Sequence, residues 1–543
     1  RYVVLHNAEP KGRASLRLLV GAGSLYEEED QRGVAHFLEH MAFNGSKNYA
    51  PGTLIEVFQR LGMNFGGDTN ASTGFDRTLY LLELPETSEK VLAEGMKVFA
   101  DYAGGLLLSG EEIDKERGVI LSEKRARDSI GMRTMEAQFG FMLGDTLLPR
   151  RMPIGTVEVI QSAPRERFVA FWDKWYRPDN ITAIIVGDVD VALAEKTIMA
   201  AFAGMQSRAA APTEPDRGRV AEFTGVRAGY HHESEAPATD VSIAVINPYR
   251  RELDTAAMRV ERLPRSLAIA MLNRRFSVLV KKEGAPFSGA RASFAQSYRV
   301  VREGSIDLEC KPGQWKEALA VGEQELRRAL QHGFRASELK EAVANTVNSL
   351  ERAVQGAATR RSSALAGEIA QGVLDDRVFT TPAADLALLK PALEKITPEQ
   401  CTAALREAFS GNGTFVMVSG NVKIEGDAKA AIAAAYDASK VVKVEPPPAD
   451  KEAVWAYASF GSPGKVVKRE TVADLGLTLV AFENGVRLNL KSTDFEAGRI
   501  HVGVRIGTGV LTEPKDKRGL AMLANATFSS GGLGKHSTDE LRQ

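Results

Sequence analysis

Two histidines and a glutamate stand close together near the start of a 543-residue chain that contains eight histidines. His36, Glu39 and His40 belong to the stretch GVAHFLEHMAFNGSKNY, residues 33–49. Positions i, i+3 and i+4 share one face of a helix, so a helical stretch would project these side chains together. Two imidazoles four residues apart can bind one Zn²⁺, and a catalytic zinc site adds a third protein ligand and a water. The spacing favours a catalytic site with one zinc ion per chain.

The glutamate of this H-x-x-E-H motif suits hydrolysis. Zinc lowers the pKa of a bound water towards about 7, and a carboxylate beside that water can take its proton. The order of the three residues reverses that of the H-E-x-x-H zinc peptidases. The alternative is a pair of core or surface histidines that binds no metal.

An internal repeat bears on this alternative. After a shift of 486 residues, residues 13–35 align without a gap with residues 499–521, and nine of the 23 positions are identical. In the second copy, the three positions of the motif hold Met522, Asn525 and Ala526. A purely structural need for the motif would apply to both copies, so its absence from the second copy favours a chemical role.

The third ligand is expected in the stretch SGEEIDKERGVILSEKRARDS, residues 109–129, which begins with a capping box and continues as a helix. Glu116 and Glu123 are seven residues apart, about 20° short of two full turns. They therefore fall on the stripe of Val119 and Ile120, which is expected to face the core. Carboxylates on a buried stripe need a cation or hydrogen-bond donors to stay ionised. Spacing alone leaves both glutamates open as the third ligand.

The other histidines and the two cysteines have no nearby residues in the sequence that would suggest a metal site. The remaining six histidines lie in stretches without a ligand-like companion. Cys310 and Cys401 are far apart in the sequence, and they are expected to be free thiols of the core.

The composition is that of an ordinary soluble globular protein, with 44% hydrophobic residues, 26% charged residues and a formal net charge of −1. A nearly neutral chain gives no electrostatic reason to expect binding to nucleic acid or to an anionic membrane. No apolar run approaches the length of a transmembrane segment. The length favours about three or four domains.

The order of predicted elements gives a domain plan. Residues 1–215 read as an α+β domain that ends with a strand, a turn and a helix, and residues 225–440 repeat this plan. Residues 441–465 are rich in proline, glycine and charge and are expected to form a linker. Residues 466–543 read as the truncated start of a degenerate repeat of the first domain, so a longer parent protein is expected. Strands interleaved with long amphipathic helices, without regular βαβ alternation, favour helices packed on one face of a sheet.

Several stretches together resemble one family. GVAHFLEHMAFNGSKNY and ERGVILSE are similar to motifs of the pitrilysin/insulinase family of zinc peptidases, the inverzincins. NAST (70–73), PIGT (153–156) and KWYRPDNITAIIVGDV (174–189) resemble other recurrent stretches of that family, in the same order. The layout is similar to that of the large single-chain bacterial members. The resemblance implies tandem homologous α+β domains, each with helices on a mostly antiparallel sheet, in duplicated halves, as in the mitochondrial processing peptidase fold.

The resemblance also implies roles for individual residues. His36 and His40 would be zinc ligands, and Glu39 would be the general base. In the E-R-G-V-I-L-x-E motif, the second glutamate, Glu123, would be the third zinc ligand. The first, Glu116, would contact one of the ligands without binding the zinc itself. The usual spacing in the family would instead select Glu116, which lies 76 residues after His40, whereas Glu123 lies 83 residues after it. The local motif decides for Glu123.

The activity implied by the resemblance is that of a periplasmic zinc-dependent endopeptidase acting on short or unfolded peptides in a two-halved chamber. The substrate would add as a β-strand along Asn70, Ala71, Ser72 and Thr73; without the resemblance, this stretch reads as the polar edge of a hairpin. Expected partners are peptide substrates and the protein's own missing C-terminal half or an equivalent subunit. The family's substrate-binding Arg/Tyr pair belongs to that half. The alternative function is a non-catalytic homologue that acts as a binding or assembly subunit.

Overall fold

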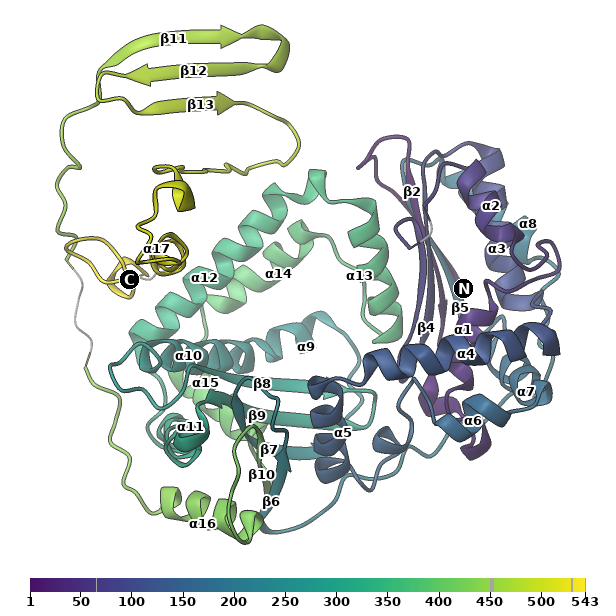
Figure 1. Cartoon of the computed structure of the whole chain (residues 1–543), viewed down its shortest axis with the longest axis horizontal. Helices are drawn as coiled ribbons and strands as arrows, with labels where there is room; N and C mark the ends of the chain where they lie inside the picture. The colour runs from purple at the N-terminus through teal and green to yellow at the C-terminus, as the bar shows by residue number, and fades with distance from the viewer. Residues whose placement is uncertain (65, 450–453, 529–530, 543) are drawn as a thin grey trace. The chain divides into compact units, whose positions relative to one another are not determined.

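A computed structural model describes residues 1–543 except 65, 450–453, 529–530 and 543 (Figure 1). Its contacts group Arg1–Phe334 with Arg360–Pro446 in a first unit, and Arg335–Thr359 with Pro447–Gln543 in a second unit. The first unit contains two five-stranded sheets. The domain boundaries expected from the sequence stay a prediction.

The first sheet has the strand order β1-β5-β2-β4-β3. Its strands are β1 (Tyr2–His6), β2 (Ala14–Val20), β3 (Thr69–Thr73), β4 (Thr78–Leu84) and β5 (Ile181–Gly187). β1 pairs with β5 in parallel, and the other neighbours are antiparallel. Every residue of the central strands β2 and β5 is buried, as expected where both faces of a sheet are covered.

Helices cover the two faces of this sheet. The helices near it in sequence that contact its strands most are α1 (Val34–Met41), α3 (Glu89–Gly104) and α8 (Val191–Phe202). The other helices of this part of the chain are α2 (Thr53–Arg60), α4 (Gly110–Arg127), α5 (Ile130–Met142), α6 (Val157–Ser162) and α7 (Arg165–Trp175). The opposite face of β5 packs against α13 (Ser362–Leu374), which comes from the region predicted as the second domain (Figure 1). Ile184 and Val186 lie in one apolar cluster with residues of α13.

The second sheet has the order β6-β10-β7-β9-β8, which repeats the order of the first sheet strand for strand. Its strands are β6 (Gly225–His232), β7 (Thr239–Pro248), β8 (Gly289–Ser297), β9 (Val301–Cys310) and β10 (Gly413–Gly420). β6 pairs with β10 in parallel, as β1 does with β5, and the other neighbours are antiparallel. The shared topology confirms the predicted fold of tandem, mostly antiparallel α+β layers.

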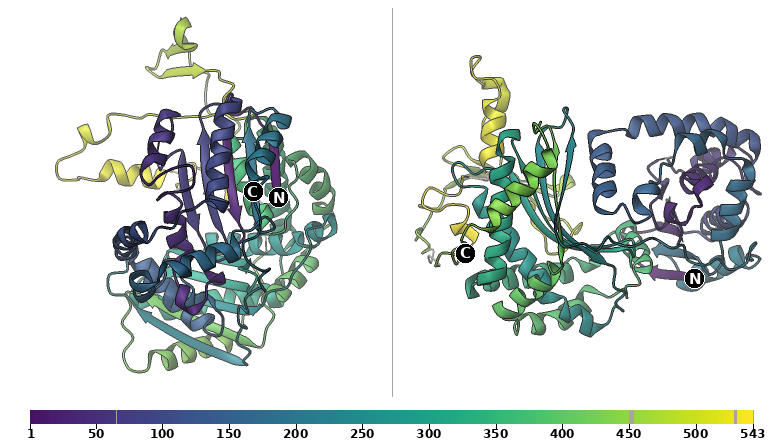
Figure 2. Two further views of the ribbon diagram at one scale, coloured as in Figure 1. Left: turned by 90° about the vertical axis from the view of Figure 1, so that its right-hand side faces the viewer. Right: turned by 90° about the horizontal axis from the view of Figure 1, so that it is seen from below.

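The second sheet has its own helices, some of which border it in the right-hand view of Figure 2. They are α9 (Ala256–Glu261), α10 (Leu263–Leu279), α11 (Trp315–His332), α14 (Pro382–Leu393), α15 (Pro398–Ala408) and α16 (Ala428–Lys440). Cys310 and Cys401 are buried free thiols, as predicted.

The second unit contains an antiparallel sheet of three strands and two longer helices. These are β11 (Val466–Val472), β12 (Leu477–Phe482), β13 (Arg487–Lys491), α12 (Ala336–Gln355) and α17 (Leu520–Phe528). α17 begins at Leu520, the position that the repeat aligns with Val34, the first residue of α1. Within 441–465, the described residues form neither helix nor strand. None of the helices in the described part of the chain combines the length and apolar character needed to cross a membrane.

Candidate metal centre

A buried carboxylate holds the beginning of α1. Glu27 accepts hydrogen bonds from the backbone N–H of Gly33 at 3.0 Å and from that of Ala35 at 2.8 Å. Gly33 has φ +104°, which favours glycine, and a Cβ there would approach the Cα of Gly155 to 2.8 Å. Burial raises the pKa of Glu27 to about 8, although the two N–H groups favour its ionised form. Because the first N–H groups of a helix lack partners within it, Glu27 fixes where α1 starts.

α1 carries the H-x-x-E-H motif on a nearly buried helix. His36 is 4% exposed and Glu39 is 8% exposed, and the apolar residues around them belong to the core. The rings of His36 and His40 lie with their centroids 4.8 Å apart. The helical geometry expected from the i, i+3, i+4 spacing is therefore present.

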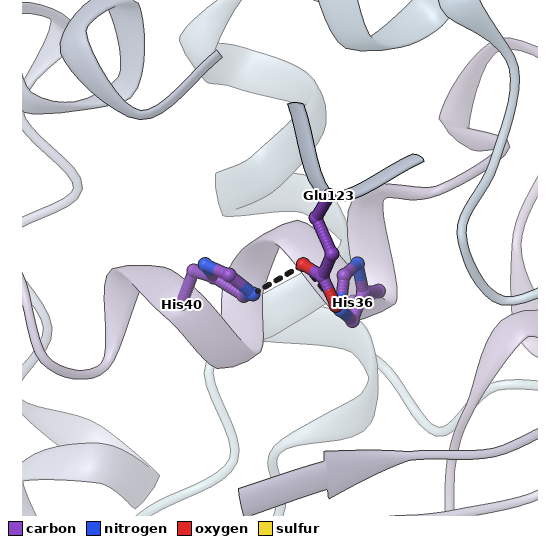
Figure 3. Close-up of side chains that lie close together, drawn as sticks. All are labelled: His36, His40 and Glu123. Atoms are coloured by element: carbon purple, nitrogen blue, oxygen red, sulfur yellow. Dashed lines mark ion pairs between the residues drawn. The ribbon is translucent and has the colours of Figure 1, made fainter. Parts of the chain in front are cut away.

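α4 brings Glu123 to the two histidines (Figure 3). Its Oε2 lies 3.3 Å from Nε2 of His40 and 3.6 Å from Nε2 of His36. This oxygen is buried and has no hydrogen-bond partner among the described residues. The other oxygen, Oε1, pairs with Nη2 of Arg127 at 2.5 Å. Arg127 thus occupies one oxygen of the carboxylate while the other faces both imidazoles.

Glu116 contacts the opposite side of the His40 ring. Its Oε1 lies 2.8 Å from Nδ1 of His40, and its Oε2 accepts from Nδ2 of Asn44 at 2.9 Å. A proton on Nδ1, donated to Glu116, leaves the lone pair of Nε2 directed towards Glu123. The hydrogen bond with His40 lowers the pKa of Glu116. Burial alone would lower the pKa of His40, but the hydrogen bond to Glu116 and the nearby carboxylates outweigh burial and raise it.

One expectation for α4 is wrong. Val119 was expected to face the core together with Ile120, but Val119 is 51% exposed, whereas Ile120 is fully buried. Ile120 lies four residues after Glu116 and three before Glu123, so the inward stripe consists of these three residues. Val119 lies on the side of α4 that faces solvent.

Burial keeps His36 neutral. It lowers the pKa of His36 to about 3, with the charges of His40 and Arg127 adding to the effect. A neutral imidazole keeps a lone pair for a metal ion. Burial raises the pKa of Glu39, and the hydrogen bond that its Oε2 accepts from Oγ1 of Thr73 at 2.5 Å opposes this. A carboxylate with a raised pKa is a better proton acceptor near neutral pH.

The residues present fit a zinc ion. One ligand atom each from His36, His40 and Glu123 lies within 4.8 Å of the others. Two neutral imidazole nitrogens and a carboxylate oxygen are the ligands of many catalytic zinc sites with three protein ligands. The buried Oε2 of Glu123, which lacks a hydrogen-bond partner, is the atom that a cation would satisfy. In the described part of the chain, no other group of three such side chains lies this close.

The predicted substrate strand, Asn70–Thr73, lies within β3, at the free edge of the first sheet. β3 also contacts α1. The structure therefore brings the predicted edge strand next to the helix that carries the motif. The contact between Thr73 and Glu39, the hydrogen bond from Asn44 and the Glu27 cap were not predicted, because these contacts depend on tertiary structure. Glu27 alone left a sequence signal, since Glu513 is identical in the repeat.

Two family profiles match the chain. The profile of insulinase (peptidase family M16) matches residues 2–137, and that of the peptidase M16 inactive domain matches residues 162–346. The chain belongs to the M16 (insulinase) family. The motif, Glu116 and Glu123 all lie in the part matched by the first profile. The resemblance found in the sequence is confirmed.

Relatives of this M16 chain are named zinc proteases. The probable zinc protease PqqL of Escherichia coli is 27% identical over 564 aligned residues, which cover 100% of this chain and 58% of PqqL. The protein of the same name in Haemophilus influenzae is 40% identical over 190 residues, 35% of this chain and 20% of that protein. The chain spans about half the length of the E. coli relative.

Solved structures agree with the fold. The crystal structure of the periplasmic protease PqqL from E. coli matches with a TM-score of 0.76 and 25% identity, covering 100% of this chain and 60% of that chain. The crystal structure of the first half of PqqL also matches with a TM-score of 0.76, at 26% identity, covering 82% of this chain and 96% of that chain. This M16 chain is thus homologous to a periplasmic protease.

Proposed function

We propose that the chain carries the active site of a zinc-dependent endopeptidase. The observation that carries the proposal is the position of Glu123, whose buried Oε2 faces Nε2 of both His36 and His40 at 3.6 and 3.3 Å. Glu39 lies on the same helix between the two histidines and is free of any ligand role in this arrangement. Membership of the M16 family supports the proposal.

Each side chain has a separate task in this mechanism. Zinc held by His36, His40 and Glu123 would supply Lewis acidity, which polarises a scissile carbonyl and acidifies a water. Glu39 accepts a proton from the attacking water and, as a glutamic acid, donates it to the nitrogen of the leaving amine. Glu116 holds the ring of His40 through Nδ1, so that Nε2 keeps its direction.

The proposed substrate is a short or unfolded peptide that adds as a strand to β3. An edge strand presents unpaired N–H and C=O groups, and an extended peptide can pair with them. Asn70, Ala71, Ser72 and Thr73 form this edge beside α1. Main-chain pairing selects for an extended backbone more than for particular side chains.

The proposals for a partner protein and for the compartment rest on the relatives. PqqL is longer than this chain, and we propose that a second half, or an equivalent subunit, completes a chamber around the site. We also propose a periplasmic location, because the homologous PqqL is periplasmic.

Zinc content and cleavage together test the proposal. The purified chain is expected to contain one zinc per molecule, measured by elemental analysis, and to lose it to a chelator. The parent protein is expected to cleave an unstructured fluorogenic peptide, to stop after chelation and to recover when zinc is added. Zinc binding without any cleavage by the parent protein would instead support a non-catalytic binding or assembly subunit.

A further inference from the structure

We propose that Thr73 is a positioning residue that links the bound peptide to the general base, an inference that rests on the proposed function. Its hydroxyl contacts the carboxylate of Glu39, and its main chain lies on the sheet edge where the peptide would add. One residue would therefore set both the orientation of the base and the distance between the base and the substrate backbone.

The hydroxyl contact is short and directed. Oγ1 of Thr73 donates to Oε2 of Glu39 at 2.5 Å, and Glu39 is 8% exposed. A β-branched side chain has few χ1 rotamers, so the hydroxyl direction is fixed by the strand. With Oε2 engaged, Oε1 is the oxygen of Glu39 left to accept a proton from water.

The hydrogen bonds around β3 show which main-chain groups face the free edge. The N–H of Gly74 donates to the carbonyl of Arg77, and the N–H of Glu83 donates to the carbonyl of Asp68, so residues 68 and 74 are bonded to the β4 side. In an antiparallel pair, residues alternate between bonded and non-bonded positions. The odd-numbered residues of β3 therefore direct their N–H and C=O groups to the free edge.

Two of these odd-numbered residues are available to a peptide. The carbonyl of Thr69 already accepts from the N–H of Gly66 at 3.0 Å. The N–H of Ala71 donates to Oδ1 of Asn70 at 2.8 Å. The carbonyl of Ala71 and the main-chain groups of Thr73 therefore remain to pair with an added strand. A peptide that pairs with Thr73 would thus be placed next to the residue that holds Glu39.

The hairpin does not depend on the Thr73 hydroxyl for its shape. Thr73 lies opposite Thr78 in the register of β3 and β4, and the turn beyond it is closed by the hydrogen bond from Gly74 to Arg77. Phe75 at this turn packs against Tyr298 with ring centroids 4.8 Å apart. Removal of one hydroxyl should therefore leave the edge and its turn in place.

The test compares Thr73→Val with Thr73→Ser in the zinc-loaded parent protein. Valine keeps the branched shape without the hydroxyl, whereas serine keeps the hydroxyl. We expect Thr73→Val to lower kcat by about 10- to 100-fold, the usual effect of losing a hydrogen bond to a charged group, with little change in KM. Thr73→Ser should restore kcat to within about threefold of the wild type, since its hydroxyl can make the same bond. Thr471→Val, at an exposed position of β11 outside the proposed site, is the matched control and should retain the wild-type kcat.

Zinc content, melting temperature and affinity for a non-cleavable peptide are measured on the same variants, and all three should stay at wild-type values. Equal kcat in Thr73→Val and the wild type would overturn the positioning role. Equal losses in the valine and serine variants, or a loss of zinc, would show a structural role instead. Failure of the proposed function is distinct, because the wild type would then bind zinc and cleave nothing.

Discussion

At the scale of single residues, the site depends on which atom each carboxylate contacts. Glu116 lies at Nδ1 of His40, and Glu123 lies at Nε2 of both histidines. Only the Nε2 side can bind a metal while Nδ1 keeps its proton for Glu116. Glu39 is held by Thr73 and is separate from both contacts. These distinctions give each side chain a different expected phenotype.

Glu39→Gln should bind zinc with near wild-type stoichiometry and lose hydrolysis. The amide cannot accept and return the proton, so we expect cleavage to fall by about 10²- to 10⁴-fold, the usual contribution of acid–base catalysis. His40→Ala should lose the zinc itself. Elemental analysis and a peptide assay of the parent protein check both. Release of zinc by Glu39→Gln, or full activity in it, would show that Glu39 has a different role.

Glu123→Gln and Glu116→Gln should differ in a zinc titration. Loss of a direct ligand should nearly abolish zinc binding, whereas loss of a residue behind a ligand typically costs about 10- to 100-fold in metal affinity. The structure places Oε2 of Glu123 at the Nε2 atoms, so Glu123→Gln should show the larger effect. The reverse order would mean that Glu116, which the family's usual spacing selects, is the ligand.

Glu303 on β9 should make the stability of the fold depend on pH. Burial raises its pKa from 4.5 to about 7, with the charge of Asp307 adding to the effect. The folded state therefore binds this proton more tightly than the unfolded chain, and stability falls as the pH rises from about 4.5 to 7. Glu303→Gln should remove this cost, up to about 3 kcal/mol above pH 7. Its melting temperature should match that of the wild type near pH 4 and exceed it at pH 8; parallel melting curves across this range would contradict the assignment.

At the scale of elements, the metal site depends on where α1 begins. Glu27 accepts from the N–H groups of Gly33 and Ala35, and the aligned Glu513 accepts from the N–H of Ala521, in the first turn of α17, at 2.7 Å. The cap is present in both copies, whereas the H-x-x-E-H motif is present in one. The cap is therefore part of the scaffold, and the motif is an addition to it.

Glu27→Ala should lower both stability and zinc affinity. Loss of a helix cap costs about 0.5–2 kcal/mol, and unsatisfied buried N–H groups add about 1–3 kcal/mol. A frayed first turn would also displace His36, which lies in that turn, about one turn before His40. Thermal unfolding and a zinc titration measure the two effects. Glu56→Ala, at an exposed position of α2, is the control and should change neither; an unchanged zinc affinity in Glu27→Ala would show that α1 holds its position without the cap.

At the scale of the whole molecule, an apolar stretch of the repeat lacks the cover that its counterpart has. Ile500, Val502, Val504 and Ile506 are 77–89% exposed. The aligned residues of β2 are Ala14, Leu16, Leu18 and Val20, all of which are buried in the centre of the first sheet. Exposed apolar residues in such a pattern mark a surface that packs against another part of a protein. This supports the proposal of a second half.

The chain alone should bind zinc and cleave peptides poorly. His36, His40 and Glu123 are all present in it, so zinc affinity should match that of the parent protein. In the proposed chamber, a site without the second half would be open to water and would lack the groups of that half, and loss of one oxyanion-stabilising donor costs about 10²- to 10³-fold in turnover. Adding the remaining half in trans should restore cleavage of a fluorogenic peptide. Full activity of the chain alone would contradict the two-halved chamber.

The sequence by itself determined the features that depend on local spacing or on repetition. The helical spacing of His36, Glu39 and His40 follows from the period of a helix, and the tandem α+β plan follows from repeated strand and helix patterns. The repeat of residues 13–35 at 499–521 was visible because identical aligned residues can be counted without a structure. These features need no knowledge of which distant segments meet.

Only the tertiary structure decided the contacts between distant segments. Glu116 and Glu123 lie on one stripe of α4, so helical periodicity left both open, and only the family motif pointed to Glu123. The packing of α4 against α1 brings Oε2 of Glu123 to the Nε2 atoms. Tertiary packing also brings Thr73 of β3 next to Glu39 of α1. It places α13 against a sheet that is far from it in sequence. Periodicity sets the direction of a side chain relative to its own element, whereas its partner depends on how the elements pack.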